Sequence, residues 1–230
     1  MKNAHALAQE EILDYLRSDY RKKFAQADAQ EKNGKSRELE TLFSNLGALA
    51  GFGCQIAIRE ALVKKGIMPI QQAFTRIYTE DKETFFYGDH LNEPLLSTEE
   101  DRISVYSLVA GPALDLGVED LPDREEIAGY YASKIGHKEF YEPRLPPEHM
   151  PRELPVTGLR HWGVTNDIQI KHKIEPLFWG WTYAMIAQKL IYEVKDTFSP
   201  GLAAKIVMEA AIPMSKMDPI SIDTKYAQAG

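Results

Sequence analysis

The sequence predicts a mainly α-helical protein: a single domain over residues 1–230 with about six to seven helices, one small β-hairpin and one extended arm. Three observations lead to this fold class. Apolar side chains recur at helical spacing through most of the chain. One pair of short runs within 74–87 is rich in aromatic and β-branched residues, as strands are. Five prolines within 137–155 exclude a regular helix there.

Composition and charge narrow the class of protein. The chain has 230 residues, 44% hydrophobic and 27% charged, which is enough apolar material to fold around a core. Its formal net charge is −7, and we expect no nucleic-acid partner because phosphate binding needs a basic face. The single cysteine, Cys54, excludes an internal disulfide, and the N-terminal residues lack the apolar core of a signal peptide. These features predict a cytoplasmic protein.

An uncharged run, residues 42–58, is the element on which the others are expected to pack. At helical spacing, Gly47, Gly51 and Cys54 fall on one side of it, and such small side chains let another helix come close. Three polar residues interrupt the run: Ser44, Asn45 and Gln55. Its length is at the lower limit of the about 17–25 residues that cross a bilayer. We therefore expect a buried helix and no membrane partner.

Two helices are expected before the hairpin. The first is amphipathic and spans residues 5–27, and the polar stretch 26–35 follows it as a loop. The second begins with Ser36 as its N-cap, contains the uncharged run and ends at Gly66, a residue common after helix C-termini.

The hairpin is the one strand prediction in the chain. Residues 74–79 and 84–87 are the two strands, joined by a short charged loop. A lone hairpin is marginal in water, so it should lie on the helices or pair with the edge of another chain. Residues 88–94 contain Gly, Asp, Asn and Pro and are predicted to be a turn-rich connector.

Further helices are expected after this connector. Ser97 and Glu100 have the spacing of a capping box, and Pro112 should kink or end the helix that they open. Four more helical segments follow from periodicity and caps: 120–136, 154–173, 176–198 and a helix capped by Ser199.

Two stretches are predicted to be non-helical. The proline-rich arm, residues 137–155, should follow an extended path and lay its apolar side chains on other parts of the protein. It is either a linker or an element that reaches over a partner subunit. The polar C-terminal tail, residues 213–230, is expected to be loose.

The best candidates for chemistry lie in the connector after the hairpin. Asp89, His90 and Glu93, with Asn92 between them, can supply acid–base or ligand-binding groups on a loop held by rigid elements. The alternative is a polar turn in which Asp and Asn bond their own backbone. No known catalytic spacing is met, so these residues are weak candidates.

Other reactive residue types show no recognisable pattern. The six histidines have no metal-ligand spacing, so no metal site is predicted and no cofactor is identified. Cys54 lies in an apolar run, where a buried, inert thiol is expected. Three tryptophans are candidates to line a ligand pocket, or else a core or subunit interface: Trp162, Trp179 and Trp181.

Two functions remain open from the sequence. The first is a non-enzymatic binding or interaction protein that forms a homodimer, or binds another protein, through the hairpin edge, the arm or the aromatic helix. The second is a small-molecule-binding enzyme or sensor with a pocket between helices, which would use Asp89, His90 and the aromatic residues. The absence of a catalytic motif favours the first.

Overall fold

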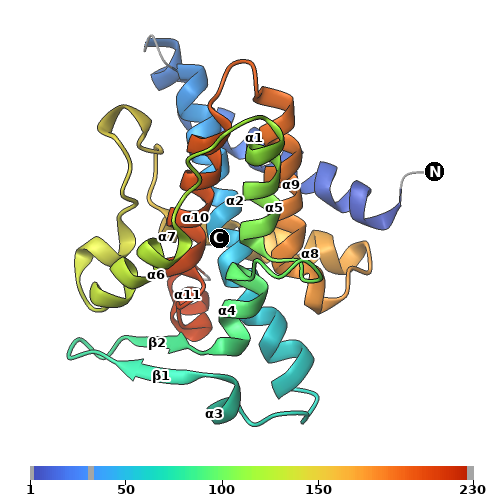
Figure 1. The fold of residues 1–230 in the computed structure, drawn as a ribbon, viewed down its shortest axis with the longest axis vertical. Coiled ribbons are helices and arrows are strands. Elements are labelled where there is room, and N and C mark those ends of the chain that lie inside the picture. Colours follow the sequence, from blue (N-terminus) through green and yellow to red (C-terminus); the bar gives the residue numbers. More distant parts are fainter. Residues whose placement is uncertain (1–2, 31–33, 227–230) are drawn as a thin grey trace.

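The computed structural model describes residues 3–30 and 34–226, and its helices gather around one central helix (Figure 1). That helix, α2 (Gly34–Ile58), runs along the long axis of the molecule. The long helices that pack on it include α1 (Ala4–Gln30), α9 (Trp179–Val194) and α10 (Pro200–Met214). A further helix, α5 (Val105–Asp115), packs on α9 and α10. The predicted mainly helical fold with one small hairpin is confirmed.

The uncharged run packs closely against two other helices. A Cβ atom added to Gly47 would lie 2.9 Å from the Cα of Val207, and one added to Gly51 would lie 2.9 Å from the Cα of Ala211. The backbones of α2 and α10 therefore touch directly, which only glycine permits at these two positions. Another side of α2 is met in the same way by α9 at Gly180. The predicted small-residue packing face is confirmed.

Helix α2 continues into a single π-helical turn, η1 (Arg59–Val63). Within the described residues, the stretch 37–63 is long and apolar enough to cross a membrane by length and composition alone. Of its most apolar window, 72% is buried inside the protein. Such burial is typical of the central helix of a globular core.

The hairpin lies at one end of the molecule (Figure 1). Its strands β1 (Thr75–Tyr78) and β2 (Thr84–Tyr87) pair antiparallel, and a short helix, α3 (Ile70–Ala73), leads into it. Lys82 in the loop has φ 64°, the left-handed conformation that closes a three-residue hairpin loop. The predicted hairpin is confirmed.

The connector after the hairpin is a helix, and the prediction of a turn at 88–94 was wrong. Helix α4 (Asp89–Leu96) begins directly after Gly88, whose φ of 147° turns the chain. Leu91 and Leu95 are fully buried one helical turn apart. Their burial fixes the helix, which outweighs the turn preference of the Gly, Asp, Asn and Pro residues around them.

The predicted start of the next helix at Ser97 was also wrong. Helix α5 begins at Val105, and its capping box is formed by Ser104 and Ser107 instead. The Ser104 hydroxyl accepts from the Ser107 N–H at 3.0 Å, and the Ser107 hydroxyl accepts from the Ser104 N–H at 2.9 Å. This pair directly precedes the apolar residues of α5, whereas Ser97 is separated from them by a charged stretch. Pro112 does not end the helix, which continues to Asp115.

The second half of the chain contains more, and shorter, helices than predicted. Helix α6 (Arg124–Ser133), capped by Asp123, lies within the predicted 120–136, and α10 begins after Ser199 as predicted. The predicted helix 154–173 is divided into shorter helical segments. The remaining elements are η2 (Lys138–Tyr141), η3 (Pro147–His149), α7 (Pro155–Gly158), η4 (Leu159–His161), α8 (Trp162–Lys171), η5 (Pro176–Phe178) and α11 (Pro219–Tyr226).

The predicted loop at 26–35 is helical where the structure describes it. Helix α1 extends to Gln30 and α2 begins at Gly34, while residues 31–33 and the side chain of Ser36 lie outside the described part of the chain.

The proline-rich arm packs on its own chain. The Phe140 side chain is fully buried, and the imidazole of His149 bonds the carboxylate of Glu40 on α2 at 2.9 Å. The Arg152 N–H donates to the Thr41 hydroxyl at 2.9 Å. The arm therefore crosses the helices of the chain to which it belongs.

The tail is not loose over its first residues, so that prediction was wrong. Residues 213–217 are buried, and the Lys216 carbonyl accepts from the Phe86 N–H of β2 at 2.9 Å. Helix α11 follows, and residues 227–230 lie outside the described chain. The polar residues here misled the prediction because they are buried with hydrogen-bond partners.

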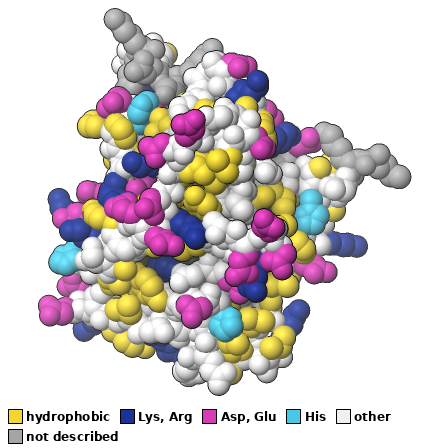
Figure 2. Space-filling model, viewed as in Figure 1, with side chains coloured by type: hydrophobic (Ala, Val, Ile, Leu, Met, Phe, Trp, Pro, Cys, Tyr) yellow, Lys and Arg dark blue, Asp and Glu magenta, His cyan; other side chains and the backbone are white. Residues whose placement is uncertain are grey.

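Charged side chains of both signs cover the face shown in Figure 2, and apolar side chains are exposed between them in small groups.

Candidate functional site

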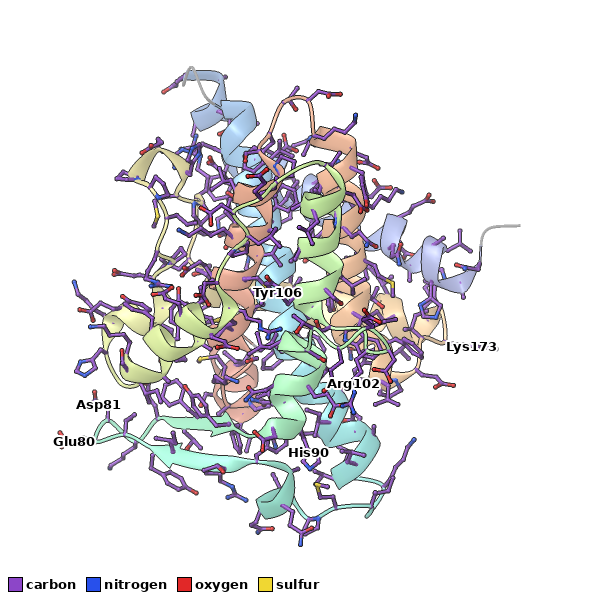
Figure 3. The ribbon with its side chains drawn as sticks, in the orientation of Figure 1. Glu80, Asp81, His90, Arg102, Tyr106 and Lys173 are labelled. Atoms are coloured by element: carbon purple, nitrogen blue, oxygen red, sulfur yellow. The ribbon has the colours of Figure 1, made fainter. Side chains whose placement is uncertain are left out.

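A pocket of about 400 Å³ lies between the second half of α2, the helix α4 and the start of α9. Its lining is mainly apolar: Cys54, Ala57, Ile58, Leu62, Pro94, Ile103, Leu177 and Trp181. Its exposed mouth carries four ionisable side chains: His90, Glu93, Asp101 and Arg102. Figure 3 labels two of these, His90 on α4 and Arg102 in the segment before α5. A concave apolar site with a few polar groups is typical of small-molecule pockets.

The wall formed by α4 is held in place through one backbone carbonyl. The Pro94 carbonyl lies in the last turn of α4, where carbonyls have no partner within the helix. It accepts from the indole N–H of Trp181 at 3.1 Å, and the thiol of Cys54 lies 3.9 Å from it. Helix α4 is thereby fastened to both α9 and α2 at the pocket.

Ion pairs close one side of the mouth. Arg102 pairs with Glu93 of α4 and, at 2.7 Å, with Glu99. All three side chains are at least 44% exposed, so these pairs contribute little to stability. Their effect is to hold the segment before α5 against α4 and to give the mouth a mixed charge.

The thiol in the pocket wall is unreactive near neutral pH. Cys54 is 1% exposed, and burial raises the pKa of its thiol to about 12, against a weaker opposite effect of Lys216. The attacking species in cysteine chemistry is the thiolate, which is nearly absent at such a pKa. Cys54 therefore acts as a small apolar wall residue, as the sequence predicted.

A buried lysine contacts α4 from the C-terminal segment. Lys216 is 4% exposed, its ammonium donates to the Asn92 side-chain oxygen at 3.2 Å, and it lies 5.0 Å from the centre of the Tyr87 ring. Burial lowers the pKa of this amine to about 8, against a weaker opposite effect of Cys54. Lys216 thus joins α10, β2 and α4 behind the pocket wall.

A second pocket, of about 540 Å³, lies on a different side of α2. Trp162 and Trp179 line it with Phe52, whose ring stands edge-on to Trp162 at 5.0 Å. The guanidinium of Arg59, also in its lining, stacks 4.2 Å above the Phe86 ring. The π-helical turn η1 borders both pockets, because Leu62 lines the first while Arg59 lines the second.

The structure divides the predicted site residues among three places. His90, Glu93 and Trp181 come together in the first pocket, and Trp162 and Trp179 lie in the second.

Asp89 lines neither of these pockets but a shallow groove along α4 that it shares with Asn92 and Glu93. The sequence analysis missed Arg102 and Ile103, which reach the first pocket from the segment before α5. Their only sequence signal is an apolar residue, Ile103, set beside charges ahead of a helix.

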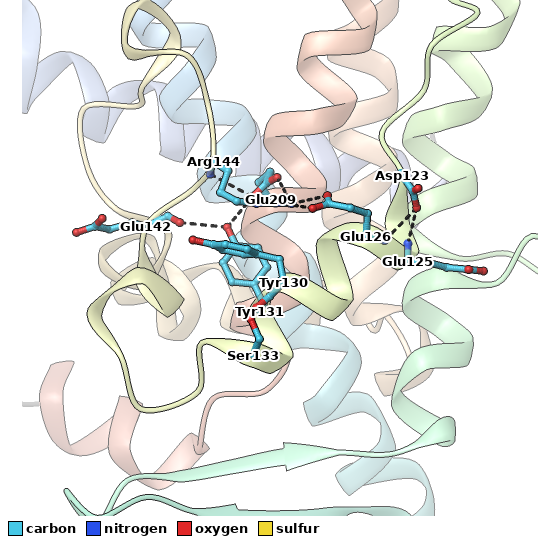
Figure 4. A network of polar contacts seen from close by, with 9 residues as sticks. All are labelled: Asp123, Glu125, Glu126, Tyr130, Tyr131, Ser133, Glu142, Arg144 and Glu209. Carbon is cyan, nitrogen blue, oxygen red and sulfur yellow. Dashed lines mark hydrogen bonds and ion pairs between the residues drawn. The ribbon is translucent and has the colours of Figure 1, made fainter.

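A buried polar network joins α10 to α6 and to the proline-rich arm (Figure 4). Glu209 is fully buried, and its carboxylate accepts from the Tyr131 hydroxyl at 2.6 Å and from the Arg144 side chain at 3.0 Å. Arg144 also pairs with Glu126 at 2.8 Å and stacks 4.1 Å over the Tyr130 ring. Burial, with the charge of Glu209, raises the pKa of Tyr131. Because the carboxylate is fully bonded, this network fixes the arm to α10.

No three His, Cys, Asp or Glu side chains are placed to hold a metal ion in the parts of the chain that the structure describes. A scan against models of known protein families gives no match, and neither curated proteins nor solved structures include a significant relative.

Proposed function

We propose that the protein is a non-enzymatic binding protein that holds a small, mainly apolar molecule in the pocket between α2, α4 and α9. The observation that carries this proposal is the apolar lining of a 400 Å³ pocket whose ionisable groups are confined to the mouth. Such a site buries the apolar body of a ligand and leaves a polar end group among His90, Glu93, Asp101 and Arg102.

Binding is favoured over catalysis by the state of the Cys54 thiol, the nucleophile in the lining. With a pKa of about 12 it stays protonated even under the charge effect of Lys216, and its sulfur faces the Pro94 carbonyl.

Native mass spectrometry of the protein as purified is the first test. We expect an extra mass that denaturation releases, and we expect it to be missing from two pocket variants. Ala57→Phe fills the space above α2, and Leu177→Asp places a charge on an exposed part of the apolar lining. Ala132→Phe is the matched control, because Ala132 is an exposed helix residue outside the pocket.

A titration covers the case in which the natural ligand is lost during purification. Octanol, octanoate and octylamine share one apolar chain and differ in their end groups, so calorimetry with all three tests the pocket and its mouth. At least one should bind the parent protein and Ala132→Phe, and bind Leu177→Asp more weakly by about tenfold or more, since a charge in an apolar pocket is costly. Absence of both a co-purified mass and probe binding would reject the proposed function, as would equal binding by all variants.

A further inference from the structure

The two outer edges of the hairpin differ in their backbone pairing. The outer edge of β2 is covered by the chain's own C-terminal segment, because the Phe86 N–H donates to the Lys216 carbonyl at 2.9 Å and Phe85 forms a bridge with Met217. The outer edge of β1 faces away from the rest of the molecule (Figure 1). Open strand edges present unpaired backbone groups to other chains.

The hydrogen bonds of the hairpin show which groups face outward from β1. The Thr79 N–H donates to the Glu83 carbonyl at 3.0 Å, so Thr79 and Glu83 are a hydrogen-bonded pair in this register. Backbone groups alternate between the two edges of a strand. The backbone groups of Ile77 therefore bond β2. Those of Arg76 and Tyr78 lie in the plane of the sheet and point away from β2, toward the open edge.

We propose that a second copy of this chain pairs antiparallel along β1, with the two-fold axis at Ile77, so that the two hairpins form one four-stranded sheet. This inference is independent of the small-molecule pocket. In this register Arg76 of one copy lies opposite Tyr78 of the other, and both pairs of outward backbone groups are bonded. The outward N–H and C=O groups of each β1 strand are then bonded by those of the other copy.

The side chains along the edge favour a second copy as the partner. Arg76 and Tyr78 alternate with Ile77, so they lie on one face of the strand, and both are exposed, Tyr78 by 67%. Pairing brings each guanidinium against a tyrosine ring of the other copy, an attractive cation–π contact that occurs twice. A register that set Arg76 against Arg76 would place like charges opposite each other, which is destabilising.

The proposed contact is short, because β1 has four residues. Stable complexes commonly bury about 800 Å² per partner, more than a single short strand supplies. The dimer should therefore depend on concentration and dissociate on dilution.

Sedimentation velocity over a range of protein concentrations tests the dimer, with proline as the probe of the edge. Arg76→Pro removes an outward N–H and leaves the bonds to β2 in place, since proline is tolerated on edge strands. We expect the parent and Arg76→Lys to dimerise on concentration and Arg76→Pro to stay monomeric with an unchanged circular dichroism spectrum. A monomeric parent at every concentration, or a dimer that Arg76→Pro leaves intact, would overturn the proposal.

Disulfide trapping tests the register. The two-fold axis places the Cα atoms of the two Ile77 residues about 4.5 Å apart, close enough to bridge, while those of the two Thr75 residues are about 14 Å apart. Mild oxidation should therefore link Ile77→Cys chains into dimers and leave Thr75→Cys chains as monomers. Cys54 does not compete, because it is buried. Equal linking of both variants, or linking of Thr75→Cys alone, would refute the register.

Discussion

The contact between helices α2 and α10 and the contacts of the proline-rich arm with these helices differ in what holds them together. Where α2 meets α10, Gly47 and Gly51 bring the two backbones into direct contact. Where the proline-rich arm crosses these helices, two fully buried carboxylates, Glu40 and Glu209, bond His149 and Arg144 of the arm. The first contact depends on shape alone, and the second depends on charges that are costly to bury unless they are paired.

The two contacts therefore tolerate different kinds of substitution. Close backbone packing accepts no added atoms, whereas a buried ion pair is most sensitive to the loss of one partner. Substitutions that add volume should therefore be most damaging at the glycines of α2, and substitutions that remove charge should be most damaging at the arm.

The largest effect is expected at the helix contact. Gly51→Val adds a branched side chain where even a Cβ atom would lie 2.9 Å from the Cα of Ala211, so the two helices must separate. We expect a loss of about 3–5 kcal/mol in the free energy of unfolding, measured by urea denaturation, or failure to fold.

Gly129→Ala is the matched control for this substitution. Gly129 is exposed within α6 and its added Cβ atom would meet nothing within 4 Å. Alanine there should stabilise the protein by about 0.5–1 kcal/mol. A Gly51→Val protein as stable as the parent would show that α2 and α10 are not held at this spacing.

The next largest effect is expected from one buried charge of the arm. Glu209→Ala leaves part of the Arg144 guanidinium without its buried carboxylate, and the Tyr131 hydroxyl keeps only the longer bond to the Glu142 carbonyl at 3.2 Å. The expected cost is about 3 kcal/mol, near the lower end for breaking a buried pair, because Arg144 keeps Glu126. Thermal and urea unfolding measure it.

Glu126→Gln is the comparison for this prediction, since Glu126 bonds the same arginine but is 56% exposed on its side chain. Its cost should stay below about 1 kcal/mol. Equal losses for Glu209→Ala and Glu126→Gln would mean that burial does not decide the strength of the arm contact.

Among the residues that the structure describes, the buried charge of Lys216 meets the amide of Asn92 and no carboxylate, so replacing Lys216 should raise the free energy of unfolding. Burial lowers the pKa of Lys216 from 10.5 to about 8, which corresponds to a cost of about 3 kcal/mol for keeping it charged. Lys216→Met loses the bonds to Asn92 and Tyr87 but removes that cost, and we expect a net gain of about 1–2 kcal/mol at pH 7.

The pH dependence gives an independent check on Lys216. Between pH 8 and 10.5 the unfolded chain binds more protons at this residue than the folded chain, so folding stability from Lys216 rises with pH. The advantage of Lys216→Met should be constant below about pH 8 and shrink towards pH 10.5. An advantage that does not change with pH would contradict the assignment.

The two contacts also differ in how far the sequence predicts them. The small residues of α2 recur at helical spacing, so the helix contact is visible in the sequence without knowing the partner helix. The arm contacts join residues far apart, such as Arg144 with Glu209 and His149 with Glu40, and no local pattern marks them.

The same reason explains the errors at the candidate site. His90, Glu93 and Trp181 were predicted from residue type, but only the burial of Leu91 and Leu95 turns the predicted connector into the helix α4 that brings them together. Local turn preference gave the opposite structure, because burial against distant helices is not encoded in neighbouring residues.

The smallest effect is expected where the arm ends in a partly exposed ion pair. Lys23 bonds the Glu153 carboxylate at 2.8 Å, but Arg160 bonds the same carboxylate at 2.7 Å and remains after Lys23→Met. We expect a loss below about 1 kcal/mol, close to that of Lys171→Met, which breaks the exposed pair with Glu11.

Acid titration tests whether Lys23 acts through the Glu153 carboxylate. Burial raises the pKa of Glu153. The bonds from Arg160 and Lys23 together lower this pKa by more than burial raises it, so the net pKa lies below the ordinary value of 4.5. The stability that Lys23 adds through Glu153 is therefore present above pH 4.5 and is lost as the pH falls through the folded-state pKa. Urea unfolding of parent and Lys23→Met should converge in that acidic range. A difference that persists there would show that Lys23 contributes by packing its apolar stem and not through the Glu153 carboxylate.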